Sequence, residues 1–132
     1  MSIVIDASVV VAALVDSGPV GRWAEEVLGS GLLLGPELVR AEATNSFRRL
    51  ERAKLITTPA ANAAQDDLMQ LDIELFPFEP FASRIWDLRH YVTSYDAWYV
   101  AIAEAFNLPI ATLDESLSKS NEVTCKFLTP GA

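Results

Sequence analysis

Ile3-Val4-Ile5-Asp6, close to the start of the chain, is a run of β-branched apolar residues that ends abruptly in an acid. An uninterrupted apolar run of this kind predicts a strand covered on both faces, as at the centre of a parallel sheet. In open α/β sheets, ligands and ions are held at the carboxyl ends of the strands. We therefore predict that a buried strand presents the carboxylate of Asp6 at a ligand-binding edge.

A second apolar run also finishes in an acid, near the other end of the chain. It reads Pro109-Ile110-Ala111-Thr112-Leu113-Asp114 and predicts a strand over residues 109–112. Further strands are expected at residues 32–34, 73–76 and 123–128. Two strands that each deliver an aspartate suggest a site built from carboxylates.

Helices are predicted between these strands from apolar spacing and capping residues. They are expected over residues 9–15 with Ser8 as N-cap, 20–28, 36–55, 58–71 opened by Thr58-Pro59, 80–88, and from Ser94 as N-cap with Asp96 in the first turn. Strands that alternate with helices predict an α/β fold with a mostly parallel sheet flanked by helices on both faces. A length of 132 residues is typical of a single domain, so residues 1–132 are expected to form one.

The composition limits the classes of function. The formal net charge of −8 argues against a surface devoted to nucleic acid, although the acids of a nuclease can serve to hold metal ions. Cys125 is the only cysteine, so no intramolecular disulfide can form. With no secretion signal and no apolar run approaching the ~18 residues of a membrane span, we expect a cytoplasmic protein without membrane contact.

Four acids stand where a metal site could form: Asp6, Glu42, Asp96 and Asp114. Glu42 falls on the shoulder of the apolar face of the predicted helix 36–55, where an unpaired charge would be costly. Carboxylates held close together raise one another's pKa, so such a cluster needs a cation. Oxygen ligands suit Mg²⁺ or Mn²⁺ rather than zinc. The predicted reaction is metal-dependent hydrolysis of a phosphodiester.

The local strings around these acids strengthen the hypothesis. Val4-Ile5-Asp6-Ala7-Ser8-Val9-Val10-Val11-Ala12-Ala13-Leu14, the helix around Glu42, Ser94-Tyr95-Asp96-Ala97-Trp98-Tyr99-Val100-Ala101-Ile102-Ala103 and Thr112-Leu113-Asp114-Glu115-Ser116-Leu117 follow one another in the expected order. Together they resemble the PIN domain and, within it, the VapC-like toxins of type II toxin–antitoxin pairs. The resemblance spans nearly the whole chain and implies a PIN-like three-layer fold.

Roles for the acids follow from the resemblance by position. Asp6 and Asp96 are expected as the principal metal ligands, and Asp114 as a third acid that completes the site directly or through water. Glu42 is expected to position the metal or the attacking water. Two hydroxyls, those of Ser8 and Thr112, match positions that flank such a site and are expected as hydrogen-bond partners of the acids.

The resemblance also implies an activity and partners. The family contains magnesium-dependent endoribonucleases, which are commonly dimeric and are silenced by a cognate antitoxin that occupies the active-site groove. An RNA substrate, a Mg²⁺ cofactor with Mn²⁺ as an alternative, a cognate antitoxin and a homodimer are therefore expected here. No acid of the pattern is missing.

Two other classes of protein also place acids after a first strand. A receiver-like signalling module usually has paired acids there and a lysine after its last strand, whereas Asp6 is followed by Ala7 and Lys126 lies inside the predicted last strand. A haloacid-dehalogenase-type phosphatase has a second aspartate where Ser8 stands. Stable labelling by a small phosphodonor would favour either class over the nuclease.

Each acid also has a purely structural interpretation. Asp6 could serve as a helix cap, Asp96 as a favourable charge in a first helical turn, and Glu42 as a partner of Arg49 or of another helix. His90 lies near a predicted helix C-terminus, where a cation is favourable, so a structural role is preferred for it over a general base.

Other conspicuous side chains are assigned structural roles. The cations on the predicted helix 36–55 are expected on an exposed face: Arg40, Arg48, Arg49, Arg52 and Lys54. The large aromatics are expected as core or dimer contacts rather than as surfaces for base stacking: Trp23, Trp86, Trp98, Tyr91, Tyr95 and Tyr99. Cys125 is expected as a small buried residue of a strand.

Overall fold

A five-stranded parallel sheet forms the centre of the computed structural model, which describes residues 1–120 and 122–131. The strands are β1 (Ser2–Ile5), β2 (Leu32–Pro36), β3 (Ile73–Phe76), β4 (Ile110–Ala111) and β5 (Phe127–Leu128). They lie in the order β3-β2-β1-β4-β5, and each neighbouring pair is parallel. The predicted α/β class is confirmed. Asn121 and Ala132, which the single-domain prediction includes, lie outside the described residues.

Strand β1 is the central strand, as its apolar run predicts. Ile3, Val4 and Ile5 are at most 1% exposed. Val4 pairs with Leu34 of β2 on one side and with Ile110 of β4 on the other. Each such side chain contributes roughly 1.5–3 kcal/mol by leaving water, so this strand anchors the fold.

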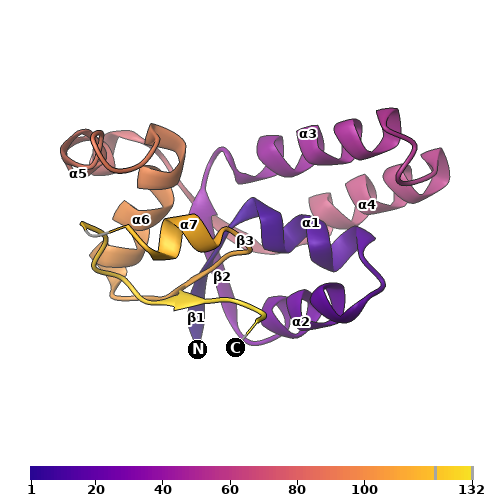
Figure 1. Ribbon diagram of the computed structural model, residues 1–132, viewed down its shortest axis with the longest axis horizontal. Helices are drawn as coiled ribbons and strands as arrows, with labels where there is room; N and C mark the ends of the chain where they lie inside the picture. The colour runs from indigo at the N-terminus through magenta and orange to yellow at the C-terminus, as the bar shows by residue number, and fades with distance from the viewer. Residues whose placement is uncertain (121, 132) are drawn as a thin grey trace.

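Helices cover both faces of the sheet and make three layers (Figure 1). One face carries α1 (Ala7–Val15), α2 (Pro19–Leu28), α3 (Val39–Arg52) and α4 (Thr58–Gln70). The other carries the 3₁₀ turn η1 (Glu79–Phe81), α5 (Ala82–Asp87) and α6 (Ser94–Phe106), and the short helix α7 (Glu115–Ser118) follows β4. The predicted covering of both faces is confirmed.

The strand order places a topological switch between β1 and β4. From β1 the chain builds β2 and β3 toward one edge of the sheet, and then returns to build β4 and β5 toward the other. In open α/β sheets the crevice for ligands lies at the carboxyl ends of the strands at such a point. Asp6 follows β1 there and Thr112 follows β4.

Three predicted N-caps are wrong. Helix α1 begins at Ala7, with Asp6 at the N-cap position, and the Ser8 hydroxyl donates to the Asp6 carboxylate instead. Thr57 rather than Thr58 caps α4, and Thr93 rather than Ser94 caps α6. Neighbouring hydroxyl residues are equivalent in a sequence pattern, and only the extended backbone of one of them decides which caps.

Several predicted boundaries also change. Helix α3 starts at Val39 rather than at residue 36, because Pro36 pairs with Phe76 in the sheet. The predicted helix 80–88 is a 3₁₀ turn followed by α5. The predicted strand 123–128 is reduced to Phe127–Leu128, which leaves Cys125 half-buried outside a strand. Helix α7 was not predicted.

One predicted surface cation has a structural role. Arg40 is half-buried, and its guanidinium donates to the backbone oxygens of Leu68 (2.7 Å) and Leu71 (2.9 Å). These two carbonyls lie at the C-terminal end of α4, where a cation is favourable. The prediction that Arg40 lies on an exposed face is wrong, because this residue joins α3 to α4.

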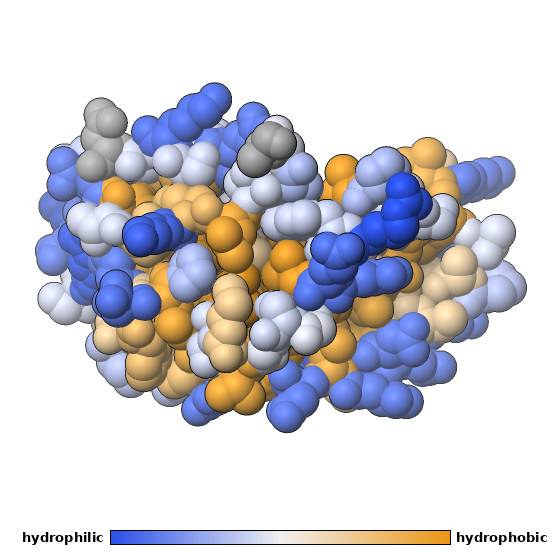
Figure 2. Space-filling view, turned by 90° about the horizontal axis from the view of Figure 1, so that it is seen from below, coloured by the Kyte–Doolittle hydropathy of each residue, from blue (hydrophilic) through white to orange (hydrophobic). Residues whose placement is uncertain are grey.

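The surface near the N-terminus mixes apolar and polar side chains (Figure 2). Met1 and Leu32 are 76% and 64% exposed. Within residues 1–120 and 122–131, no helix is both long and apolar enough to cross a lipid bilayer.

Candidate active site

Asp6 is held by hydroxyls from both sides of the β1–β4 switch. Its Oδ2 accepts hydrogen bonds from Ser8 Oγ and Thr112 Oγ1, each at 2.7 Å. These two hydroxyls in turn accept the backbone N–H groups of Leu113 (3.1 Å) and Asp114 (3.0 Å). Because a hydroxyl has one proton, each is committed as a donor to Asp6. The network fixes one carboxylate oxygen of Asp6 as an acceptor.

The same network explains how the polar side chain of Thr112 can be fully buried in the core. Thr112 is 0% exposed, and a buried hydroxyl must find partners. It finds Asp6 as acceptor and the Asp114 N–H as donor. Oδ1 of Asp6 accepts no hydrogen bond from the described residues and is free for a ligand.

Glu42 reaches the site from α3 and is held by a tyrosine of α6. The Tyr99 hydroxyl donates to Glu42 Oε1 at 2.6 Å, and Tyr99 itself is 1% exposed. Burial raises the pKa of Tyr99, so its phenol stays protonated and always acts as the donor. Of the two structural partners expected for Glu42, another helix is confirmed, since Tyr99 belongs to α6. Arg49 is not its partner among the described residues and donates to Ser46 Oγ at 3.3 Å instead.

Helix α6 serves two of the four acids. Asp96 lies in its first turn, where its backbone N–H donates to the capping hydroxyl of Thr93 at 3.2 Å. Tyr99 follows Asp96 by three residues, so the two side chains project from neighbouring positions on one face of the helix. One helix therefore presents Asp96 directly and holds Glu42 through Tyr99.

Asp114 follows β4 and caps α7. Its Oδ1 accepts from the backbone N–H of Ser116 (3.0 Å), from the Ser116 hydroxyl (2.6 Å) and from the N–H of Leu117 (3.4 Å). These contacts occupy one carboxylate oxygen and fix the direction of the side chain. A capping role of the kind considered for Asp6 thus belongs to Asp114.

The acids are close enough to influence one another's protonation. Burial, and then the charges of Asp6 and Asp96, raise the pKa of Glu42, while the Tyr99 hydroxyl partly opposes this. Burial, and then the charges of Asp6 and Asp114, raise the pKa of Asp96, which the Thr93 hydroxyl partly lowers. An ionised cluster of this kind is costly, and a cation bound among the acids would relieve the cost.

The acids line two hollows at this edge of the sheet. Asp6, Glu42 and Asp114 line one of about 320 Å³, together with Asn45 and Arg49. This agrees with the sequence, which places Glu42 on a helix shoulder.

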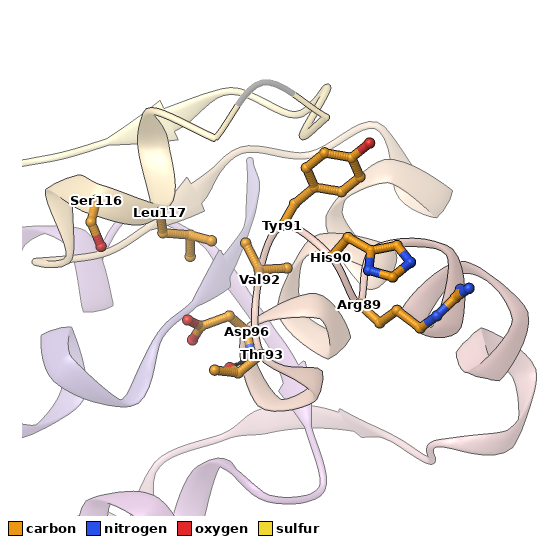
Figure 3. A pocket seen from close by; sticks show the side chains of 8 residues that line it. All are labelled: Arg89, His90, Tyr91, Val92, Thr93, Asp96, Ser116 and Leu117. Carbon is orange, nitrogen blue, oxygen red and sulfur yellow. Dashed lines mark hydrogen bonds between the residues drawn. The ribbon is translucent and has the colours of Figure 1, made fainter.

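Asp96 lines a second and larger cleft, of about 530 Å³. Figure 3 shows its carboxylate directed toward the side of Ser116 and Leu117 on α7. Arg89 and Tyr91 fan outward along the far rim of the cleft.

The donor set fits a hard cation better than a soft one. The candidate ligands are carboxylate and hydroxyl oxygens, which Mg²⁺ and Mn²⁺ prefer. Nowhere in the described parts of the chain do three Asp, Glu, His or Cys side chains lie close enough together to hold one ion. The hydrogen bonds of Glu42 to Tyr99 and of Asp114 to α7 turn these two acids toward protein partners. The geometry therefore suits an ion that retains water, with few direct protein ligands.

The sequence did not indicate the role of Tyr99. It was expected as a core or dimer contact, and its ring is indeed buried, but its hydroxyl serves the site. The available signal was its position three residues after Asp96. That spacing alone does not reveal which acid a tyrosine would reach across the fold, because the partner lies 57 residues away in the chain.

Comparison with known proteins agrees with this geometry. Residues 3–122 match the family model of the PIN domain. The chain belongs to the PIN domain family. This PIN domain is 35% identical to Ribonuclease VapC1 of Mycobacterium tuberculosis over 125 residues, which cover 94% of each chain. It is 32% identical to Ribonuclease VapC9 of the same organism over 123 residues, covering 93% of this chain and 94% of the relative.

Solved structures share the fold of this PIN domain. PAE2754 from Pyrobaculum aerophilum superposes with a TM-score of 0.66 at 20% identity, covering 96% of this chain and 89% of that one. VapBC2 from Rickettsia felis, solved with a DNA fragment from its promoter, has a TM-score of 0.64 at 12% identity and covers 98% of both chains. With the family established, the receiver-like and phosphatase alternatives no longer apply.

Proposed function

We propose that this PIN domain is a Mg²⁺-dependent endoribonuclease, with Mn²⁺ as an alternative metal, and that it acts as the toxin of a toxin–antitoxin pair. The observation that carries the proposal is that four carboxylates from separate elements lie near the β1–β4 switch, close enough for their charges to raise the pKa of Glu42 and of Asp96. They come from the end of β1, from α3, from α6 and from the start of α7. Relatives named ribonucleases, aligned over more than nine tenths of the chain, support the same activity.

The four acids divide the work of holding a metal ion. Asp6 and Asp96 are the proposed direct ligands, Asp114 contributes directly or through water, and Glu42 serves the water that attacks. Mg²⁺ is typically held by one or two carboxylates together with waters and substrate phosphates, so it does not need three of these acids as direct ligands. When bound, Mg²⁺ supplies positive charge that polarises the attacking water and offsets charge on the phosphate.

Neighbouring side chains orient two of these acids by hydrogen bonds. Ser8 and Thr112 donate to Oδ2 of Asp6 and so leave Oδ1 for the ligand side. Tyr99 holds Oε1 of Glu42, which leaves Oε2 to accept a proton from the attacking water. The raised pKa of Glu42 favours this acceptance, because a proton acceptor works best when its pKa approaches the working pH.

The proposal includes partners. RNA is the substrate, a cognate antitoxin blocks the acidic site, and the toxin forms a homodimer in the cytoplasm. Structures that share this fold include VapBC2 and VapBC-5, a member of the VapBC family of toxin–antitoxin systems from Mycobacterium tuberculosis, with a TM-score of 0.56 at 21% identity. These neighbours support the proposal of an antitoxin partner. Co-expressing the toxin with the gene beside it would test for this partner.

Asp96→Asn is the sharpest test of the activity. The carboxylate of Asp96 takes no part in the hydroxyl network around Asp6, so the change removes a charge and leaves that network intact. We expect the cleavage rate to fall by more than about 100-fold, since even indirect partners of a metal are worth 10–100-fold. The assay uses a mixed panel of structured and single-stranded RNA with Mg²⁺, Mn²⁺ or EDTA.

Asp66→Asn is the matched control. Asp66 is an exposed acid of α4, away from the site, and its loss changes the net charge by the same amount. This variant should cleave as the wild type does. Wild-type activity in Asp96→Asn, or cleavage that persists in EDTA, would contradict the proposed mechanism.

A further inference from the structure

An arginine on the rim of the Asp96 cleft is held in place by a tryptophan. The Arg89 guanidinium lies 4.2 Å from the centre of the Trp86 ring, and its Nη1 donates to the backbone oxygen of Trp86 at 2.9 Å. Trp86 is 65% exposed, which is unusual for so large an apolar side chain. The pair therefore presents a pre-arranged cation at the surface, and less side-chain entropy is lost when it binds.

Arg89 carries its charge without a protein counter-ion. It forms no salt bridge with any acid in residues 1–120 and 122–131, although the net charge of the chain is −8. Arg84, which lies in α5 whereas Arg89 lies in the turn after it, pairs with Glu104 at 2.7 Å. A fixed cation that an acidic protein leaves unneutralised is suited to an anionic ligand.

Arg89 lines the same cleft as Asp96, one of the four acids. Arg89, Tyr91 and Val92 line the cleft whose lining also includes Asp96 and Leu117 (Figure 3). Figure 3 shows Asp96 and Arg89 on opposite sides of this cleft, so a strand whose phosphate lay at Asp96 would extend along residues 90–93 to reach Arg89. Tyr91 is 52% exposed on this rim, so its ring is open to contact.

We propose that Arg89, positioned by Trp86, binds a second phosphate of the RNA strand that is cleaved, and that Tyr91 stacks on an unpaired base there. The inference rests on the proposed ribonuclease activity and adds the form of the substrate, which is single-stranded at this position. Bases reach aromatic and guanidinium faces only when they are unstacked, as in loops and single strands. The charge of Arg89 offsets the repulsion between an acidic protein and its polyanionic substrate.

The dependence of binding on salt tests the phosphate contact. Binding of fluorescein-labelled 12-nucleotide single strands and of matched hairpins is followed by anisotropy between about 50 and 200 mM salt. EDTA is present, so binding is separated from cleavage. We expect Arg89→Ala to weaken binding about tenfold and to lower the slope of log K against log salt by about 0.7, the value for one phosphate of a single strand. The control, Arg48→Ala on the exposed face of α3, should change the general charge only.

Three further variants separate charge from shape. Arg89→Lys should restore the salt slope but not the full affinity, because an ammonium keeps the charge and lacks the planar face. Tyr91→Ala should weaken single-strand binding about tenfold and hairpin-stem binding far less, whereas Tyr91→Phe should bind as the wild type does, since it keeps the ring. Exposed positions of this kind allow each variant to keep the unfolding midpoint of the wild type.

The outcomes distinguish this inference from the proposed function. If the wild type cleaves RNA with Mg²⁺ and Arg89→Ala matches Arg48→Ala in affinity and slope, the inference is wrong and the ribonuclease stands. If no strand binds the wild type in EDTA, the inference is also wrong. If the binding results appear as expected but no RNA is cleaved with any metal, the docking surface stands and the ribonuclease proposal fails.

Discussion

At the scale of one residue, Glu42 lowers the stability of the folded protein. Its carboxylate is half-buried on α3, near the charges of Asp6 and Asp96, and its pKa is raised. Only the Tyr99 hydroxyl favours the ionised form among the causes of this shift. A side chain kept in such surroundings costs folding free energy at neutral pH, which is typical of functional groups.

Glu42→Gln should therefore not destabilise the metal-free protein. At pH 7 we expect an unfolding midpoint equal to or above that of the wild type, because the amide removes the charge and can still accept from Tyr99. Because folding raises the pKa of Glu42, the folded wild type binds a proton at this carboxylate more tightly than the unfolded wild type does. The advantage of the variant should thus shrink as the pH falls through the raised pKa toward the ordinary value of 4.5.

Thermal unfolding in EDTA at several pH values measures this difference. Asp66→Asn, on the exposed surface of α4, controls for the change in net charge. A clear fall in the midpoint of Glu42→Gln at pH 7 would mean that the charge of Glu42 stabilises the fold through an ion pair.

At the scale of elements, α6 links the two sides of the site. It packs on β1, β2 and β4 of the sheet, and its residues Val100 and Ile102 are both 0% exposed. The same helix presents Asp96 in its first turn and sends Tyr99 to Glu42 on α3. The hydrogen bond thus joins helices that lie in different layers.

Tyr99→Phe tests that link. The variant keeps the buried ring and loses only the hydroxyl, so Glu42 is free to turn away. We expect cleavage to fall about 10–100-fold, as for other partners that orient metal-site carboxylates, with only a small change in unfolding midpoint. Tyr95→Phe removes a hydroxyl from the same helix at a side chain that is 59% exposed, and should be neutral.

A double variant makes the test specific to Glu42. If Tyr99 acts through that acid, adding Tyr99→Phe to Glu42→Gln should lower the cleavage rate little further, because both changes remove the same interaction. Additive losses in the double variant would mean that Tyr99 affects the site by another route.

For the whole molecule, which has a net charge of −8, folding brings acids from four elements close enough for their charges to influence one another. Folding brings these charges together, and the unfolded chain does not. A divalent cation that binds among them therefore binds the folded state preferentially and stabilises it by mass action.

Mn²⁺ should accordingly raise the unfolding midpoint of the wild type. At a metal concentration about 100 times the dissociation constant, the shift should be roughly 5–10 °C for a domain of this size. Asp96→Asn should lose most of the shift, and Asp66→Asn should keep it. An equal shift in all three proteins would indicate general screening of charge rather than binding at the site. Differential scanning fluorimetry with a Mn²⁺ titration measures all three.

The sequence by itself determined the class of fold and was enough to select the candidate acids. Asp6 and Asp114 follow apolar runs, and a strand buried on both faces must be apolar along its length, so these positions are visible without a structure. Asp96 follows hydroxyl residues at a helix start for an equally local reason. Such features depend on neighbours in the chain.

Only the tertiary structure decided how those acids are held. The bonds from Thr112 to Asp6 and from Tyr99 to Glu42 join residues 106 and 57 positions apart, and Arg40 reaches the end of α4 across 28 and 31. The backbone conformation likewise decided which of two neighbouring hydroxyl residues caps α4 and which caps α6. Local patterns encode propensity and burial, whereas a partner distant in the chain is set by how the layers pack, and no local pattern contains that information.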